Sequence, residues 1–150
     1  MNRRIQMLAL IVIVSFFCFG FEGILLKDYK TENQDEKEIL ATLIGYEEAY
    51  NKHDAEKCLS YLCDEGRFRP GGAITKFSKK EYAVVLPSDF DNYESRIDYN
   101  PKITISGDKA YVDLQSDISI YTVDYKYTLK KEKDKWLILE TDYRNARYKE

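Results

Sequence analysis

Histidine is nearly absent from this chain, because His53 is the only one among 150 residues. A metal site built on several imidazoles is therefore excluded, and a Ser-His-Asp arrangement would have to use that one residue. His53 lies between two predicted helices, in a turn where exposed or capping polar residues are common. The sequence thus predicts no metal site, no catalytic residue and no cofactor.

Glycine and clustered positive charge are also scarce. The only adjacent glycines are Gly71 and Gly72, which lack the lysine and the strand-to-helix context of a phosphate-binding loop. Lys and Arg number 23 against 26 Asp and Glu, so the chain is slightly acidic. The densest basic segment, residues 130–135, is a predicted hairpin tip in which Glu132 and Asp134 separate the lysines. No nucleic-acid partner is expected.

Cysteine is limited to Cys18, Cys58 and Cys63. In an exported domain the last two would remain, and such a pair suggests a disulfide. Positions five apart in an unbroken helix point about 140° away from each other, so a bridge requires the helix to end near Leu62. Buried thiols are the favoured interpretation, and the disulfide is the alternative.

Only one long hydrophobic run occurs, and it lies at the N-terminus. Arg3 and Arg4 precede an apolar stretch at residues 7–21, a pattern that is typical of an export signal and short for a membrane span. We therefore expect residues 1–26 to be a signal peptide or an N-terminal membrane anchor. Residues 27–150 would then form one extracytoplasmic domain that is secreted, periplasmic or membrane-anchored.

Three modes of processing stay open. Cleavage after Gly20 fits the small residues at Cys18 and Gly20. An uncleaved anchor through Leu26 is the second mode, since the apolar run extends that far. Lipid attachment at Cys18 is the third, although Phe16 and Phe17 are bulky where a lipoprotein signal has small residues. In each case the membrane would be contacted only through the N-terminal segment.

Helices are predicted in the first half of the chain. Residues 35–51 carry apolar side chains at helical spacing. After a short turn, Asp54 is a good N-cap for a second helix whose apolar face extends to Leu62. A capping-box pattern at residues 78–81 opens a third, short helix, which Pro87 is expected to end.

Strands are predicted in the rest of the chain. Their alternating segments lie at residues 67–69, 74–77, 96–106, 110–114, 118–129 and 136–143. In the long segment the side-chain phase slips between Ile120 and Tyr121, which predicts a β-bulge there. Helices followed by antiparallel strands indicate an α+β domain.

This order of elements, over roughly residues 35–143, resembles the nuclear transport factor 2-like superfamily, which also holds ketosteroid isomerases and polyketide cyclases. The most specific parts are residues 46–54, residues 55–68 and the segment Trp136-Leu137-Ile138. The resemblance implies an exported member with a curved antiparallel sheet wrapped on about three N-terminal helices. Such a cone-like, cystatin-type roll has a pocket at its open end.

The resemblance also allows one known reaction to be tested. In ketosteroid isomerases a tyrosine of the first helix donates a hydrogen bond to the developing oxyanion, and Tyr46 occupies the matching place. Their general base is an aspartate at the end of the first strand, where this chain has Pro70 between Arg69 and Gly71. In those enzymes a second acid, on a late strand, assists the tyrosine. The nearest acid here is Asp124, and the alternation along its strand places its side chain on the face expected to point to water. Ketosteroid-type isomerisation is therefore not expected.

Three strand carboxylates remain as candidates for an acid pair: Asp98, Asp113 and Asp117. Side-chain alternation places the last two opposite Val112 and Leu114, so both are expected to face water. No acid and base can be assigned from the sequence.

We therefore expect a non-enzymatic module that binds a small apolar ligand or a protein partner. Four aromatic residues are predicted to line the pocket: Tyr46, Tyr50, Phe68 and Tyr125. The alternative is an isomerase, lyase or hydrolase with an unplaced acid and base, and an inward carboxylate of raised pKa near Tyr46 would favour it.

A weak homodimer is also predicted. Members of the resembled superfamily often pair through the outer face of the sheet. Here that face would carry Thr122, Asp124, Lys126 and Thr128 on one strand and Tyr111, Asp113 and Gln115 on another. Because this face is polar, it suggests either a modest, wet homodimer or a monomer.

Overall fold

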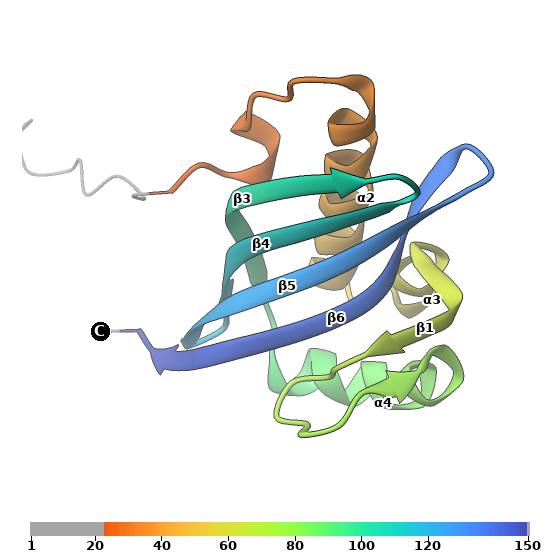
Figure 1. Cartoon of the computed structure of the whole chain (residues 1–150). Helices are drawn as coiled ribbons and strands as arrows, with labels where there is room; N and C mark the ends of the chain where they lie inside the picture. Colours follow the sequence, from red (N-terminus) through yellow and green to blue (C-terminus); the bar gives the residue numbers. More distant parts are fainter. Residues whose placement is uncertain (1–22, 150) are drawn as a thin grey trace, which may run out of the picture.

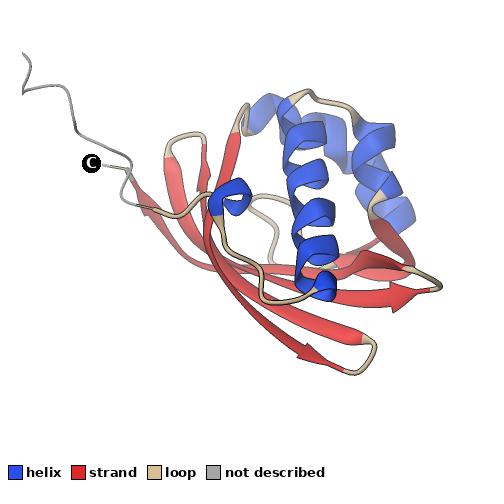
Figure 2. Cartoon of the chain, turned by 90° about the horizontal axis from the view of Figure 1, so that it is seen from above, coloured by secondary structure: helices blue, strands red, loops and turns tan. Residues whose placement is uncertain are grey.

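The computed structural model describes residues 23–149, in which helices pack on one side of a curved sheet (Figures 1 and 2). The helices are the short 3-10 helix η1 (Leu26–Asp28), α2 (Gln34–Asn51), α3 (Ala55–Ser60) and α4 (Lys79–Asn92). The strands are β1 (Leu62–Phe68), β2 (Phe77–Ser78), β3 (Arg96–Ser106), β4 (Lys109–Ile118), β5 (Tyr121–Glu132) and β6 (Lys135–Tyr148). The α+β fold predicted from the sequence is confirmed.

The sheet has the strand order β2-β1-β6-β5-β4-β3. Every neighbouring pair is antiparallel except β1 and β6, which are parallel. The curved sheet is therefore antiparallel as predicted in every pair but one, and this single parallel pair makes it mixed. A parallel pair needs a long connection, and here β2, α4 and the strands β3 to β5 separate β1 from β6 along the chain.

The helices begin where their capping residues predict. Asp54 accepts a hydrogen bond from the backbone of Lys57 at the start of α3. Ser78 and Glu81 form the capping box of α4, in which each side chain bonds the other residue's backbone N–H. Asn33 caps α2 in the same way as Asp54 caps α3.

Pro87 does not end its helix, contrary to the prediction, because α4 continues to Asn92. A proline in a helix interior removes one backbone hydrogen bond and crowds the preceding turn. Leu86 and Phe90, on either side of it, are 0% and 4% exposed, and their burial offsets that cost. The continuation adds a helical turn that carries Asp89 to the inside of the protein.

The predicted bulge between Ile120 and Tyr121 is instead a chain reversal. Ile118 at the end of β4 pairs with Tyr121 at the start of β5, so Ser119 and Ile120 form a two-residue turn. Ser119 has a φ of 52°, as tight hairpin turns require. The phase slip in the sequence therefore marks the passage from one strand to the next.

Two boundaries also differ from the prediction. The helix α3 ends at Ser60, so Leu62 opens β1 instead of closing the helix. The partner strand β2 keeps only Phe77 and Ser78, and residues 69–76 form a loop. Cys58 and Cys63 lie on different elements as buried free thiols, and burial raises the pKa of each to about 12.

The described part of the chain begins before the predicted domain boundary. Leu25 forms a β-bridge with Tyr99, and Leu26 is 3% exposed in the core. Cleavage after Gly20 and lipid attachment at Cys18 concern positions outside the described residues. Within residues 23–149, no helix has the length and hydrophobicity that crossing a membrane would require.

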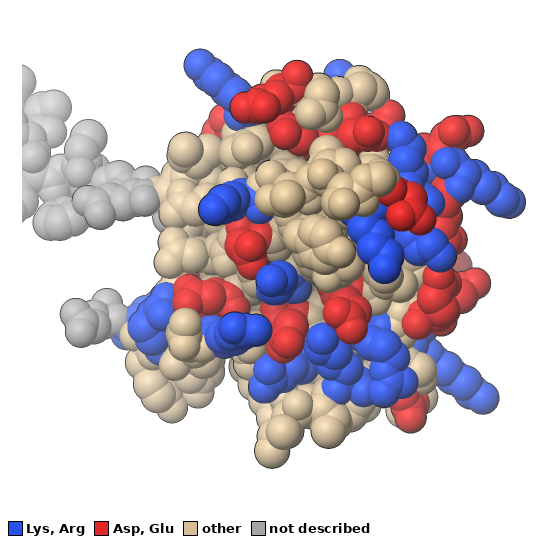
Figure 3. Space-filling view, in the orientation of Figure 1, with Lys and Arg blue, Asp and Glu red and all other residues tan. Residues whose placement is uncertain are grey.

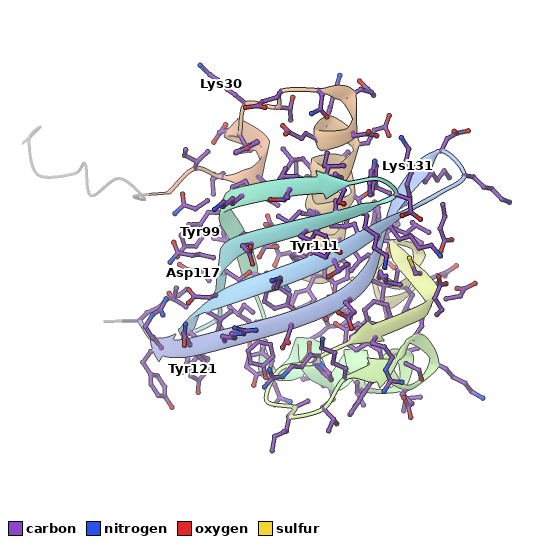
Figure 4. All side chains as sticks on the ribbon, in the orientation of Figure 1. Lys30, Tyr99, Tyr111, Asp117, Tyr121 and Lys131 are labelled. Carbon is purple, nitrogen blue, oxygen red and sulfur yellow. The ribbon has the colours of Figure 1, made fainter. Side chains whose placement is uncertain are left out.

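The outer face of the sheet is polar, as the alternation of side chains predicts. Tyr111 lies there (Figure 4). Asp113 faces Lys126 of the neighbouring strand, with 3.8 Å between charged atoms. Figure 3 shows charged groups of both signs around a patch without charges on this side of the molecule. The weak homodimer stays a prediction.

Trp136 of β6 packs against α2 on the inner face of the sheet. Its side chain is 2% exposed, and its indole N–H donates to the Asp35 carboxylate at 3.0 Å. The Thr42 hydroxyl donates to the Trp136 carbonyl at 2.7 Å. Lys131, which Figure 4 labels, lies 2.6 Å from the same Asp35 carboxylate, so Asp35 links the indole to this lysine.

Replacing Trp136 by alanine should lower the free energy of unfolding by roughly 3 to 5 kcal/mol, because a fully packed aromatic ring leaves a large cavity. Chemical denaturation followed by circular dichroism measures this change. Ile74→Ala, at a loop position that is 91% exposed, is the control and should leave the midpoint unchanged. Equal midpoints for both variants would contradict the packing role of Trp136.

Candidate functional site

A cavity of about 240 Å³ lies at the open end of the fold, bounded by α2, α4, the 69–76 loop and the inner face of β3 to β6. Six tyrosines form most of its wall: Tyr50, Tyr82, Tyr93, Tyr121, Tyr125 and Tyr143. Ile118, Val123 and Ala146 add apolar surface, and Arg69, Asp89 and Arg96 supply charged groups. Figure 4 marks this end of the sheet by Tyr121.

Several hydroxyls of these tyrosines already bond to the protein. The Tyr50 hydroxyl donates to Asp89 Oδ2 at 3.2 Å, and the Tyr82 and Tyr46 hydroxyls lie 2.9 Å apart. Tyr143 donates to backbone carbonyls of the loop at residues 70–73. Because these hydroxyls are engaged elsewhere, the rings contribute mainly apolar surface to the cavity.

Two arginines and two tyrosines form a stack along the inner face of β5 and β6. The Arg69 guanidinium lies 4.2 Å from the ring centroid of Tyr143, and Arg96 lies 4.1 Å from that of Tyr125. The two rings are stacked with centroids 6.1 Å apart and an angle of 23° between planes. Cation–π contacts of this kind hold planar groups in fixed orientations. The cavity wall is therefore preformed.

Arg96 is buried together with its counter-ion. The side chains of Arg96 and Asp98 are 3% and 0% exposed, and Arg96 Nε donates to Asp98 Oδ1 at 2.9 Å. Arg96 Nη2 donates to the hydroxyls of Ser116 and Tyr127, and both hydroxyls also bond to Asp98. Burial by itself would lower the pKa of Arg96, but the negative charge of Asp98, together with the neighbouring hydroxyls of Tyr127, Tyr125 and Tyr46, outweighs burial and raises that pKa.

Side chains of α2 bind the backbone of the same strand. Asn51 donates to the Arg96 carbonyl and accepts from the Arg96 N–H, both at 2.7 Å. The Asp98 N–H donates to Glu47 Oε2 at 2.7 Å. Burial, followed by the nearby charge of Asp98, raises the pKa of Glu47 to about 7.

Asp89 is an inward carboxylate on α4. It is 8% exposed, and it accepts hydrogen bonds from the Gly71 N–H at 2.9 Å and from the Tyr50 hydroxyl. Burial raises its pKa, and these two bonds only partly oppose the shift. The Tyr93 ring covers Gly71 so closely that a Cβ at this position would collide with it. A larger residue at Gly71 would therefore have to displace the Tyr93 ring.

The four residues that the sequence assigns to the pocket divide into two pairs. Tyr50 and Tyr125 lie in the cavity wall. Tyr46 and Phe68 are buried behind the wall, and both contact Tyr82. The hydroxyls of Tyr46 and Tyr82 lie 2.9 Å apart, and the ring centroids of Phe68 and Tyr82 lie 5.7 Å apart. The burial of both leaves their rings inside the core.

The sequence indicated Asp98 as a candidate acid, but it did not assign Arg69, Asp89 or Arg96 to the cavity. Arg96 and Asp98 are two apart on a strand, so they share a face, and that spacing was the available signal for a buried ion pair. Asp89 was not predicted to face inward, because the helix was expected to end at Pro87. His53 is exposed and stacks on Phe90 with centroids 5.1 Å apart, in the turn before α3. The described residues contain no group of His, Cys, Asp and Glu that would hold a metal ion.

No protein-family model and no curated protein matches the chain. Solved structures do match. A protein with a cystatin-like fold from Nostoc punctiforme has a TM-score of 0.64 at 19% identity, over 77% of this chain and 93% of its own. An NTF2-like protein from Shewanella baltica has a TM-score of 0.64 at 18% identity, over 81% and 100% of the two chains.

This chain has the nuclear transport factor 2-like fold. A scytalone dehydratase-like protein from Novosphingobium aromaticivorans also matches, with a TM-score of 0.64 at 12% identity, over 77% of this chain and 88% of that one. The resemblance to the nuclear transport factor 2-like superfamily that the sequence indicates is confirmed for the fold. At these identities the likeness concerns architecture, so function has to be argued from the cavity itself.

The raised pKa of Glu47 predicts a pH-dependent stability. A folded-state carboxyl that titrates near 7 instead of 4.5 binds protons more tightly than the unfolded chain does. Its favourable contribution is complete below about pH 4.5 and is lost as the pH rises through 7. The stability of Glu47→Gln relative to wild type should therefore increase by roughly 2 kcal/mol between pH 4.5 and 7.5.

Urea denaturation at several pH values measures this difference. Glu48→Gln removes the same charge from the exposed neighbouring position and serves as the control. Parallel pH profiles for wild type and Glu47→Gln would show that Glu47 is solvated like an ordinary surface carboxylate.

Proposed function

We propose that the domain is a non-enzymatic module that binds one small, largely aromatic or apolar molecule in the cavity. The observation that carries this proposal is the wall itself, in which tyrosine rings surround a few buried polar groups. Small-molecule sites in proteins have this composition: apolar and aromatic walls with a small number of placed polar groups that set orientation.

The rigidity of the wall supports the same function. Arg69 and Arg96 are stacked on Tyr143 and Tyr125, and Arg96 is also held by Asp98. A ligand that enters such a wall does not have to order it, and this lowers the entropic cost of binding. A protein partner would contact a surface more readily than a cavity of about 240 Å³, so the cavity favours a small molecule.

Closing the mouth of the cavity should abolish binding without unfolding the protein. Ala146 lines the cavity and is exposed, so Ala146→Trp adds a large ring at the entrance with little strain in the core. Arg144→Trp, two residues earlier and also exposed, is the matched control on the outer face. Native mass spectrometry of the purified proteins should detect a retained ligand on wild type and on Arg144→Trp but not on Ala146→Trp.

The unfolding midpoints of the three proteins should agree, which separates loss of binding from loss of fold. A wild-type protein that retains no ligand, and that binds no member of a library of small aromatic compounds, would contradict the proposed function.

An acid–base enzyme of the isomerase, lyase or hydrolase type is the second candidate. Asp89 favours it, because a carboxyl of raised pKa in a cavity is suited to proton transfer. The adjacent Tyr50 hydroxyl is a further proton donor. Asp89 lies on α4, whereas the position that resembles the isomerase base is Pro70.

The two candidates differ in the fate of the ligand. Under the proposed function, NMR spectra of the retained ligand should stay unchanged during incubation with wild-type protein. Conversion of the ligand by wild type, and its loss in Asp89→Asn, would instead make Asp89 the proton-transfer group. Asp91→Asn, an exposed position on the same helix, is the control for the substitution.

A further inference from the structure

We propose that the ligand of this cavity is an aromatic carboxylate, whose acidic group binds to Arg96 while its ring lies against Tyr125 and Tyr143. This inference rests on the proposed function, since it names the chemical class of the molecule that the cavity takes.

The first argument is the hydrogen bonding of Arg96. Its three bonds to Asp98, Ser116 and Tyr127 use Nε and Nη2. A guanidinium has five N–H groups, and those of Nη1 take part in none of these bonds. Since Arg96 also lines the cavity, an Nη1 N–H is the donor that can face a ligand. The Tyr125 hydroxyl is itself a side-chain hydrogen-bond partner of Arg96 and of Thr141, so at least one of the two Nη1 N–H groups remains for a ligand.

The second argument is the free-energy cost of binding a ligand that offers no hydrogen-bond acceptor to the Arg96 guanidinium. A bound molecule displaces solvent from the cavity wall, and a buried donor that loses water without gaining an acceptor is unfavourable. A charged guanidinium makes this penalty larger than a neutral donor does. A carboxylate meets the requirement best, because bonds between two charged groups are the shortest and strongest.

The third argument is the charge of the wall. Arg69 and Arg96 both line the cavity, and Asp89 is its one acidic residue among those that the structure describes. Both oxygens of Asp89 already accept bonds from the protein. Each arginine is ion-paired with an aspartate outside the cavity lining, Arg69 with Asp142 at 2.8 Å and Arg96 with Asp98 at 2.9 Å. A cationic ligand would therefore meet the arginine side of each pair and no free carboxylate, so its binding is disfavoured.

The fourth argument is the presence of the ion pair itself. Replacing a buried ion pair by well-packed apolar residues is often neutral or stabilising. Stability alone therefore does not explain why two charged residues, Arg96 and Asp98, occupy this place. The pair holds the guanidinium plane at the cavity wall, with Asp98 behind it and the Tyr125 ring on its face. Such fixed geometry suits recognition of a planar oxyanion.

The size of the cavity limits the ligand. A protein cavity of about 150 Å³ holds benzene, so about 240 Å³ accommodates one or two rings with an acidic substituent. Stacked tyrosine faces favour a planar apolar body over a flexible chain.

Three pairs of probes test the inference on the purified protein by isothermal titration calorimetry: benzoate with benzamide, trans-cinnamate with cinnamamide, and 2-naphthoate with 2-naphthamide. Each pair keeps the shape and changes the charge. We expect the carboxylate of the best-fitting pair to bind at least tenfold more tightly than its amide. Equal affinities within a pair that binds would overturn the inference and leave the proposed function intact. Absence of binding for all six probes would count against both.

A double variant assigns the effect to Arg96. Arg96→Met with Asp98→Asn removes both charges together, so no buried charge is left unpaired, and the asparagine oxygen still accepts from Ser116. The ratio of carboxylate to amide affinity should fall to about one. Lys126→Met with Asp113→Asn deletes an ion pair from the outer face and should keep the wild-type ratio. An unchanged ratio in the Arg96 variant would overturn the assignment.

Tyr125→Phe provides a second, milder variant, because it keeps the ring and removes only the hydroxyl beside the guanidinium. We expect it to lower the same affinity ratio several-fold while the affinity for the amide changes little. A ratio equal to that of wild type would exclude the hydroxyl from the site. The wild-type comparison of acids with amides holds whether or not either variant folds.

Discussion

The buried ion pair of Arg96 and Asp98 is the constraint on which the rest of the fold depends. Two charges lose their hydration here, and a single broken partner would leave the other uncompensated, at a cost of about 3 to 5 kcal/mol. The pair is satisfied only when Ser116 of β4 and Tyr127 of β5 stand beside it. It therefore sets the relative positions of three strands. Asn51 of α2 adds its two bonds to the Arg96 backbone, so the helix is held to the same point.

The cavity follows from how the elements around this pair end. The helix α4 continues past Pro87, and its last turn brings Asp89 to the Tyr50 hydroxyl and to the Gly71 N–H. These bonds hold the 69–76 loop at one side of the opening. The stack on β5 and β6 lines the other side. Rings whose edges are already bonded cannot collapse inward without breaking those bonds, which keeps space between the two sides.

Much of the architecture was predictable because it is encoded locally. Caps at Asp54 and Ser78 act on their own helix termini, and alternation along β4 and β5 assigns each side chain to a face. Predictions failed where a distant contact overrides a local preference. Burial of Leu86 and Phe90 outweighs the helix-breaking tendency of Pro87, and pairing with β4 turns an apparent bulge into a hairpin.

For the candidate site, the sequence by itself determined the faces of the strands and of α2, and that tyrosine is frequent on their inner side. It also determined the spacing that places Arg96 and Asp98 on one face of β3. Only the tertiary structure decided that Tyr50 and Tyr125 reach the cavity while Tyr46 and Phe68 lie behind Tyr82. The physical reason is that periodicity defines the direction of a side chain relative to its own backbone. The depth at which its ring ends depends on the curvature of the sheet and on the neighbours that pack against it.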